Sequence, residues 1–176
     1  IKNGELEWLG SYGVRNNSTK EKVNDSTLFM IASCAKPITA LGLMKLYDDG
    51  LISLDDDINK YLPFKIVNPN FPDKSITIRM ILTHTSSFTD DIDQLNSLYT
   101  YDSGGDSPIK LEQFIKDYFL LHGKYYNLQK NFSTNAPGTM KSYCNTGYAM
   151  AGFLIERITH ISFKDYMKEE IFKPLL

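Results

Sequence analysis

The sequence predicts an α+β fold, in which a strand-forming N-terminal segment (residues 1–28) precedes a mainly helical region (residues 29–176). Residues 5–9, Glu-Leu-Glu-Trp-Leu, partly alternate between polar and apolar side chains, which is the period of a strand. Farther along the chain, apolar residues recur at the spacing of three and four that is typical of helices. No internal repeat or linker divides the chain, so we expect a single domain.

The N-terminal residues, from Ile1 to about Arg15, read as strands. Asn3-Gly4 is typical of a hairpin turn. Residues 16–25 are polar and predict a loop. A short apolar segment, residues 29–32, then leads into Ser33.

The strongest helical pattern runs from Ser33 to Asp49, and Gly50 is a natural C-terminal stop. Pro37 is tolerated only in the first turn, where backbone amides have no partner within the helix. We therefore expect the helix to begin with Ser33 as its N-cap. Its apolar residues cover most of the circumference, which predicts a central, buried helix. They are Ile38, Leu41, Leu43, Met44, Leu46 and Tyr47.

Further helices are predicted at residues 54–62, 75–83, 111–121, 147–159 and 163–171. The first contains Asp55, Asp56 and Asp57, which suit the positive end of a helix, so we interpret them as capping residues. The helix at 147–159 has small residues that allow close packing. Residues 101–108, with two adjacent glycines, are predicted to be a mobile surface loop.

Charge and hydropathy exclude some classes of function. The net charge is −2 and no basic stripe is present, so we expect no nucleic-acid partner. No apolar stretch approaches the roughly 18 residues of a membrane span. The chain opens at Ile1 rather than Met, which is compatible with a leader that was removed or left out.

The cysteines and histidines do not predict a structural or metal site. Cys34 and Cys144 are too few for a disulfide scaffold. We expect two small buried thiols, and a disulfide between them stays open as the alternative. His84, His122 and His160 are too dispersed to predict a metal centre. We expect a structural role for His84, and we predict no cofactor and no metal.

Two short motifs carry reactive groups. Ser33-Cys34-Ala35-Lys36 places a hydroxyl and an amine on one face of a helix. A serine nucleophile needs a base. Lys36 can accept the proton only when neutral, the form that burial and the positive helix end favour. Tyr143 is a second candidate, because a nearby ammonium favours its phenolate. Asn145 can hold an amide or ester carbonyl.

The tetrad alone is weak, because an N-cap serine followed by a surface lysine is common. The surrounding sequence favours the chemical interpretation. The tetrad begins a strongly apolar helix and follows a strand-like segment. A second motif, Tyr-Xaa-Asn, occurs farther along the chain at residues 143–145. Which of Lys36 and Tyr143 is the base stays open.

With these motifs the chain resembles the serine β-lactamase and penicillin-binding protein family. It is most similar to the class C branch, with DD-carboxypeptidases and family VIII-type esterases. The likeness extends over residues 31–40, 49–56, 81–86 and 137–148. The resemblance implies that Ser33 is acylated, that Lys36 and Tyr143 move protons, and that Asn145 contacts the substrate amide. It also implies an extracytoplasmic location.

Two features depart from the family pattern. Ser87 stands where the family usually has glycine. No Lys-Thr-Gly or His-Xaa-Gly follows Asn145, although the family's third motif lies on a strand after that point. We therefore expect the N-terminal part of a catalytic domain, with most sheet strands missing. The remainder would be disordered, cut away, or carried on a second chain or fragment.

The motifs favour a serine acyl-enzyme hydrolase that cleaves an amide, ester or lactam in a small-molecule or peptide substrate. A D-alanyl peptide, a small ester and a β-lactam all fit, and fold resemblance does not choose among them. The alternative is an inactive or self-assembling structural or binding protein on the same scaffold. The sequence leaves the oligomeric state open.

Overall fold

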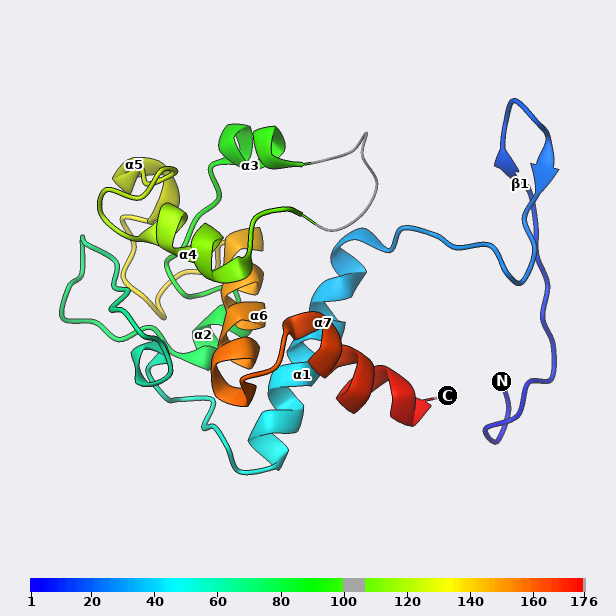
Figure 1. The fold of residues 1–176 in the computed structure, drawn as a ribbon, viewed down its shortest axis with the longest axis horizontal. Coiled ribbons are helices and arrows are strands. Elements are labelled where there is room, and N and C mark those ends of the chain that lie inside the picture. Colours follow the sequence, from blue (N-terminus) through cyan, green and yellow to red (C-terminus); the bar gives the residue numbers. More distant parts are fainter. Residues whose placement is uncertain (100–106, 176) are drawn as a thin grey trace. The chain divides into compact units, whose positions relative to one another are not determined.

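The computed structural model describes residues 1–99 and 107–175, in two compact units, Ile1–Cys34 and Ala35–Leu176 (Figure 1). The smaller unit contains an antiparallel pair of strands, β1 (Val14–Asn16) and β2 (Glu21–Lys22). It ends in a 3-10 turn, η1 (Ala32–Cys34).

The strand prediction for the N-terminus is mostly wrong. Only its last two residues lie in a strand, and β2 falls in the segment predicted to be a loop. Asn3-Gly4 does form a turn, with φ of 52° and 84°, closed by a bridge between Lys2 and Glu5. Trp8 and Leu9 are largely exposed. Alternation forms a stable strand only where a second layer buries one face, and within the smaller unit, which is described in full, no such layer covers Trp8 and Leu9.

The predicted central helix is α1 (Ala35–Asp48), which begins after η1 rather than at Ser33. Ser33 therefore lies within a 3-10 turn and is not the N-cap. Pro37 falls in the first turn of α1, where its missing N–H costs no helical bond. Gly50 has a φ of 72°, and its N–H donates to the carbonyl oxygen of Tyr47, so it ends the helix as predicted.

The prediction that α1 is a central, buried helix is correct for only part of its circumference. Leu43 and Leu46 are buried, but Leu41, Met44 and Tyr47 are between 38% and 48% exposed. Among the described residues, α1 packs against α6 (Asn145–Thr159) and η3 (Met167–Phe172), which cover one side of the helix. An all-round apolar helix needs neighbours on every side.

Helix α6 is the centre of the larger unit (Figure 1). It packs against α1, α2 (Ile78–Leu82), α4 (Leu111–Phe119) and α7 (Phe163–Tyr166). Ala151 and Gly152 are buried in this packing, and a Cβ built at Gly152 would be in ordinary van der Waals contact with Leu111 and Phe163, at 3.4–3.5 Å. The close packing predicted for the small residues of this helix is confirmed.

The shorter helices were predicted less well. In place of the helix expected at 54–62 there is only a 3-10 turn, η2 (Ile58–Lys60). One of the three aspartates caps it: Asp57 accepts from the N–H of Asn59. Asp55 instead pairs with Arg79, and Asp56 accepts from the N–H of Ser53 and pairs with the lysine at 60. Asp55 thus serves a tertiary contact and Asp56 serves contacts within its own segment, and neither caps a helix.

Two described helices were not predicted, α3 (Ile92–Leu98) and α5 (Leu128–Asn131). The chain ends in η3, a π turn, and η4 (Lys173–Leu175), in place of a regular helix through residue 171. The predicted surface loop at 101–108 lies largely outside the described residues. Among the described helices, none has the length and apolarity needed to cross a membrane.

Candidate active site

The second motif lies at the start of α6, which begins at Asn145 and not at Gly147 as predicted. Cys144 is the N-cap, and its Sγ accepts from the N–H of Gly147. Burial, followed by the negative charge of Asp90, raises the pKa of Cys144 to about 12, so its thiol is neutral. Cys144 is buried as expected, whereas Cys34 is exposed, and neither is in a disulfide.

Asp90 anchors this helix start. Its carboxylate accepts from the backbone N–H groups of Asn145 (2.7 Å) and Thr146 (2.9 Å). It also accepts from the Asn145 side-chain amide (2.8 Å) and the Thr146 hydroxyl (2.9 Å). Burial alone would raise the pKa of Asp90, but these hydrogen bonds outweigh it and hold the pKa below its usual value. The ionised carboxylate faces the positive end of α6.

The Asp90 contact sets the direction of the Asn145 amide. Because Nδ2 donates to the carboxylate, Oδ1 points the other way and accepts from Nζ of Lys36 at 2.7 Å. A flipped amide would set an acceptor against the carboxylate of Asp90 and a donor against the Nζ donor of Lys36. Asp90 was missed in the sequence analysis, because it lies 55 residues before Asn145 and belongs to no motif.

Lys36 also lies against two aromatic rings. Its Nζ is 4.7 Å from the ring centroid of Tyr143 and 5.8 Å from that of Tyr148. An ammonium near an aromatic face is attracted by the ring quadrupole. The first turn of α1 and the start of α6 are thus joined at one cluster, which contains Lys36, Tyr143 and Asn145.

His84 holds the loop before α6. Its Nδ1 accepts from the N–H of Cys144 (3.1 Å), and its carbonyl oxygen accepts from the N–H of Ser142 (2.8 Å). Its ring lies 4.5 Å from the ring of Tyr143, centroid to centroid. His84 thus binds the backbone on each side of Tyr143, at Ser142 and Cys144, and so positions Tyr143. This is the structural role that the sequence suggested. Burial, followed by the charges of Lys36 and of the lysine at 141, lowers the pKa of His84.

The lowered pKa of His84 makes the unfolding free energy depend on pH. Because its pKa is lower in the folded state, the unfolded chain binds more protons just below pH 6.5. The contribution of His84 to the unfolding free energy is complete above about pH 6.5 and is lost as the pH falls through the folded-state pKa. We therefore expect the unfolding free energy, measured by urea titration, to fall as the pH is lowered below about 6.5.

Two matched variants test this assignment: His84→Asn removes the titrating group, and His122→Asn is the control. Both positions have a left-handed backbone, with φ of 60° and 72°, which asparagine tolerates, and His122 is exposed. The first variant is expected to flatten the pH dependence and the second to keep it. An equal slope in the two variants would contradict the assignment.

The structure shows how Ser87 is accommodated where the family usually has glycine. Its φ is 67°, a conformation that glycine adopts without strain. The serine side chain compensates: Oγ donates to the carbonyl oxygen of Asn135 and accepts from Nδ2 of Asn68, both at 2.6 Å. Asn68 is fully buried, so the hydroxyl satisfies a polar group that glycine would leave without this partner.

Of the four predicted site residues, the larger unit brings together Lys36, Tyr143 and Asn145. Ser33 belongs to the smaller unit, where it lies in η1, three residues before Lys36 in the chain. Ala32, just before it, has a φ of 43°, which is uncommon for a residue with a Cβ. Among the described residues, no group of three acidic, histidine or cysteine side chains is arranged to hold a metal ion.

Known proteins are similar to this chain along its whole length. Penicillin-binding protein 4* of Bacillus subtilis (strain 168) is 30% identical over 171 residues, which are 97% of this chain and 34% of that protein. The octameric penicillin-binding protein homologue from Pyrococcus abyssi superposes with a TM-score of 0.75 at 28% identity, over 99% of this chain and 37% of that one.

D-amino acid amidase from Ochrobactrum anthropi SV3 gives a TM-score of 0.67 at 25% identity, over 93% of this chain and 40% of that one. The chain spans about a third of the length of the curated relatives it matches. The predicted α+β fold is confirmed, as a helical region with a small antiparallel sheet, and only part of the full fold is present. The Beta-lactamase family model matches residues 1–176, and the chain belongs to that family.

Proposed function

We propose that the complete protein is a serine acyl-enzyme hydrolase that cleaves an amide, ester or lactam, with Ser33 as its nucleophile. The observation that carries this proposal is the cluster around the Lys36 amine. Its Nζ donates to Asn145 at 2.7 Å and lies 4.7 Å from the centroid of the Tyr143 ring. An amine, a phenol and a carboxamide held together supply the proton acceptors and the substrate anchor that a serine nucleophile needs.

The reaction proceeds in two steps. The Ser33 hydroxyl attacks the substrate carbonyl, its proton passes to Lys36 or Tyr143, and a tetrahedral intermediate forms, stabilised by backbone amides. The C–N or C–O bond then breaks, and the leaving group takes the proton. Water attacks the resulting ester of Ser33 in the same way, which releases the acid and restores the hydroxyl. Asn145 contacts the substrate amide.

The names of similar proteins support the substrate class. One is a penicillin-binding protein and another is a D-amino acid amidase. A D-alanyl peptide, a small ester and a β-lactam all contain the acyl carbon that this mechanism requires. We propose these as the substrate classes, and an extracytoplasmic location for the protein.

Acylating probes test the proposal. We expect a fluorophosphonate or a labelled penicillin to modify the complete protein at Ser33, and we expect Ser33→Ala to abolish labelling. Ser26→Ala is the control, because this serine is exposed and lies in the same unit outside the motif. Peptide mass spectrometry locates the adduct. Absence of labelling by every probe would contradict the proposal and favour an inactive binding scaffold.

A further inference from the structure

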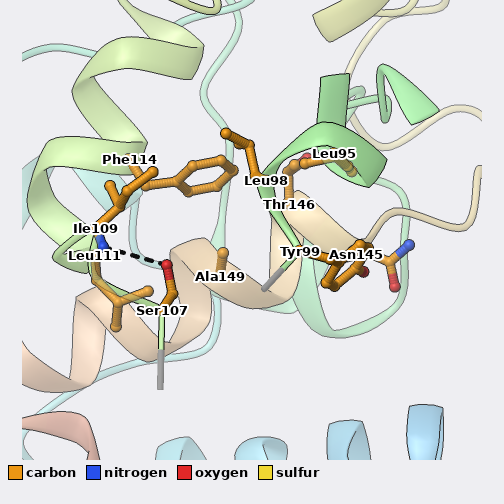
Figure 2. Close-up of a pocket in the computed structure, with 10 residues that line it drawn as sticks. All are labelled: Leu95, Leu98, Tyr99, Ser107, Ile109, Leu111, Phe114, Asn145, Thr146 and Ala149. Atoms are coloured by element: carbon orange, nitrogen blue, oxygen red, sulfur yellow. Dashed lines mark hydrogen bonds between the residues drawn. The ribbon is translucent and has the colours of Figure 1, made fainter. Parts of the chain in front are cut away.

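Tyr148 contacts the proposed site but has no part in the proposed mechanism. It lies on α6, three residues after Asn145. At about 3.6 residues per turn, the positions three and four residues after Asn145 fall on either side of it around the helix. Ala149 lines the cavity shown in Figure 2, whereas Tyr148 lies next to Lys36. The ring of Tyr148 also lies 5.2 Å from the ring of His84, centroid to centroid.

The hydroxyl of Tyr148 fixes the position of the ring. It donates to the carbonyl oxygen of Leu82 at 3.1 Å. Leu82 is the last residue of α2, and the final carbonyl groups of a helix have no partner within it. The side chain is therefore attached to α6 by its backbone and to the end of α2 by its hydroxyl. A ring fixed at both ends can hold a more flexible neighbour in place.

Tyr148 keeps its proton near neutral pH. Burial, followed by the charge of Tyr143, raises the pKa of Tyr148 above the ordinary value of a phenol. The hydroxyl hydrogen is also used in the hydrogen bond to Leu82. Tyr148 is therefore not a third proton acceptor beside Lys36 and Tyr143. What it offers to the site is the face of its ring.

The Lys36 amine lies near two tyrosine rings. Its Nζ is 4.7 Å from the ring centroid of Tyr143 and 5.8 Å from that of Tyr148. Aromatic faces attract both ammonium ions and N–H donors. Because the lysine stem is long and flexible, the position of Nζ depends on such contacts. Loss of the Tyr148 ring would remove one of the contacts that set the distance between Lys36 and Tyr143.

We propose that Tyr148 is a positioning residue, whose ring keeps the Lys36 amine next to Tyr143. Proton transfer requires the partners to be within hydrogen-bond reach, and a displacement of about 1 Å can cost about a hundredfold in rate. The inference rests on the proposed function, because it names a residue that supports proton transfer from Ser33. It holds whichever of Lys36 and Tyr143 accepts the proton.

Acylation of the complete protein by a chromogenic ester, under single-turnover conditions, tests the proposal. Tyr148→Leu removes the ring and is expected to lower the maximal acylation rate about tenfold to a hundredfold. The ester concentration at half-maximal rate should change little, because substrate binding is not affected. Tyr148→Phe keeps the ring and should lose less than about fivefold. If the phenylalanine variant were as impaired as the leucine variant, the hydroxyl and not the ring would be required, and the proposal would be wrong.

Tyr126→Leu is the matched control. This tyrosine is also half-buried, and its ring contacts Phe132, outside the cluster around Lys36. Both leucine variants are expected to lower the unfolding free energy in urea, but only Tyr148→Leu should slow acylation. An equal loss of activity in the two would assign the effect to stability and overturn the proposal. Should Tyr148→Leu fail to fold, Tyr148→Met makes the same comparison, because methionine also lacks a ring and adapts to irregular space.

The wild-type protein separates this inference from the proposed function. If Ser33-dependent acylation occurs and Tyr148→Leu is acylated at the wild-type rate, the inference is wrong and the proposed function stands. If the wild type shows no acylation that depends on Ser33, both are wrong.

Discussion

Lys36→Arg is expected to lower kcat about a hundredfold to ten-thousandfold, the range for loss of a general base. Arginine keeps a hydrogen-bond donor next to Asn145 but cannot accept a proton, because its guanidinium stays charged in proteins. Lys36→Met, which keeps the apolar stem and removes the amine, should be equally impaired. The measurement is the rate of acylation by a chromogenic ester under single-turnover conditions.

The arginine variant separates a proton-transfer role from a structural one. If the lysine served only as a cation that holds Asn145 by the 2.7 Å hydrogen bond, arginine would restore most of the activity. Activity within about tenfold of wild type would therefore contradict Lys36 as the proton acceptor. It would point to Tyr143, and Tyr143→Phe would then carry the large loss.

Asp90→Asn is expected to lower the unfolding free energy by about 2–4 kcal/mol, because hydrogen bonds to a charged group and a favourable helix-end charge are both lost. At least one donor of Asn145 or Thr146 would face an amide NH₂ instead of a carboxylate oxygen. We also expect slower acylation, because Asn145 would no longer be held with Oδ1 toward Lys36.

Asp93→Asn is the matched control. Its carboxylate is 94% exposed and lies 3.7 Å from Lys130, a pair that contributes little. Its loss should cost less than about 0.5 kcal/mol in urea unfolding. The pKa of Asp90 is lowered, so its stabilisation is present above the usual carboxylate pKa and is lost in acid. The unfolding free energy of Asp90→Asn should therefore fall less in acid than that of the Asp93→Asn control. Equal unfolding free energies of the two variants would contradict the role of Asp90 in anchoring the start of α6.

Long helices with a local apolar period were predictable. The helix predicted at 111–121 is present as α4, which ends two residues earlier, and the helix at 147–159 is present within α6. The short helices α3 and α5 were not predicted. Each relies on a side-chain cap, Asp91 for α3 and Asn127 for α5, and one turn or two carry too little apolar periodicity to detect.

The sequence by itself determined the family and predicted the site residues: Ser33, Lys36, Tyr143 and Asn145 are recognisable because type and spacing within each motif are local properties. Only the tertiary structure decided how the three residues of the larger unit, Lys36, Tyr143 and Asn145, are oriented. The Asn145 amide is aligned by Asp90, 55 residues away, and by Lys36, 109 residues away. Hydrogen bonds between such distant segments form where packed helices bring them together, and no pattern along the chain records that geometry.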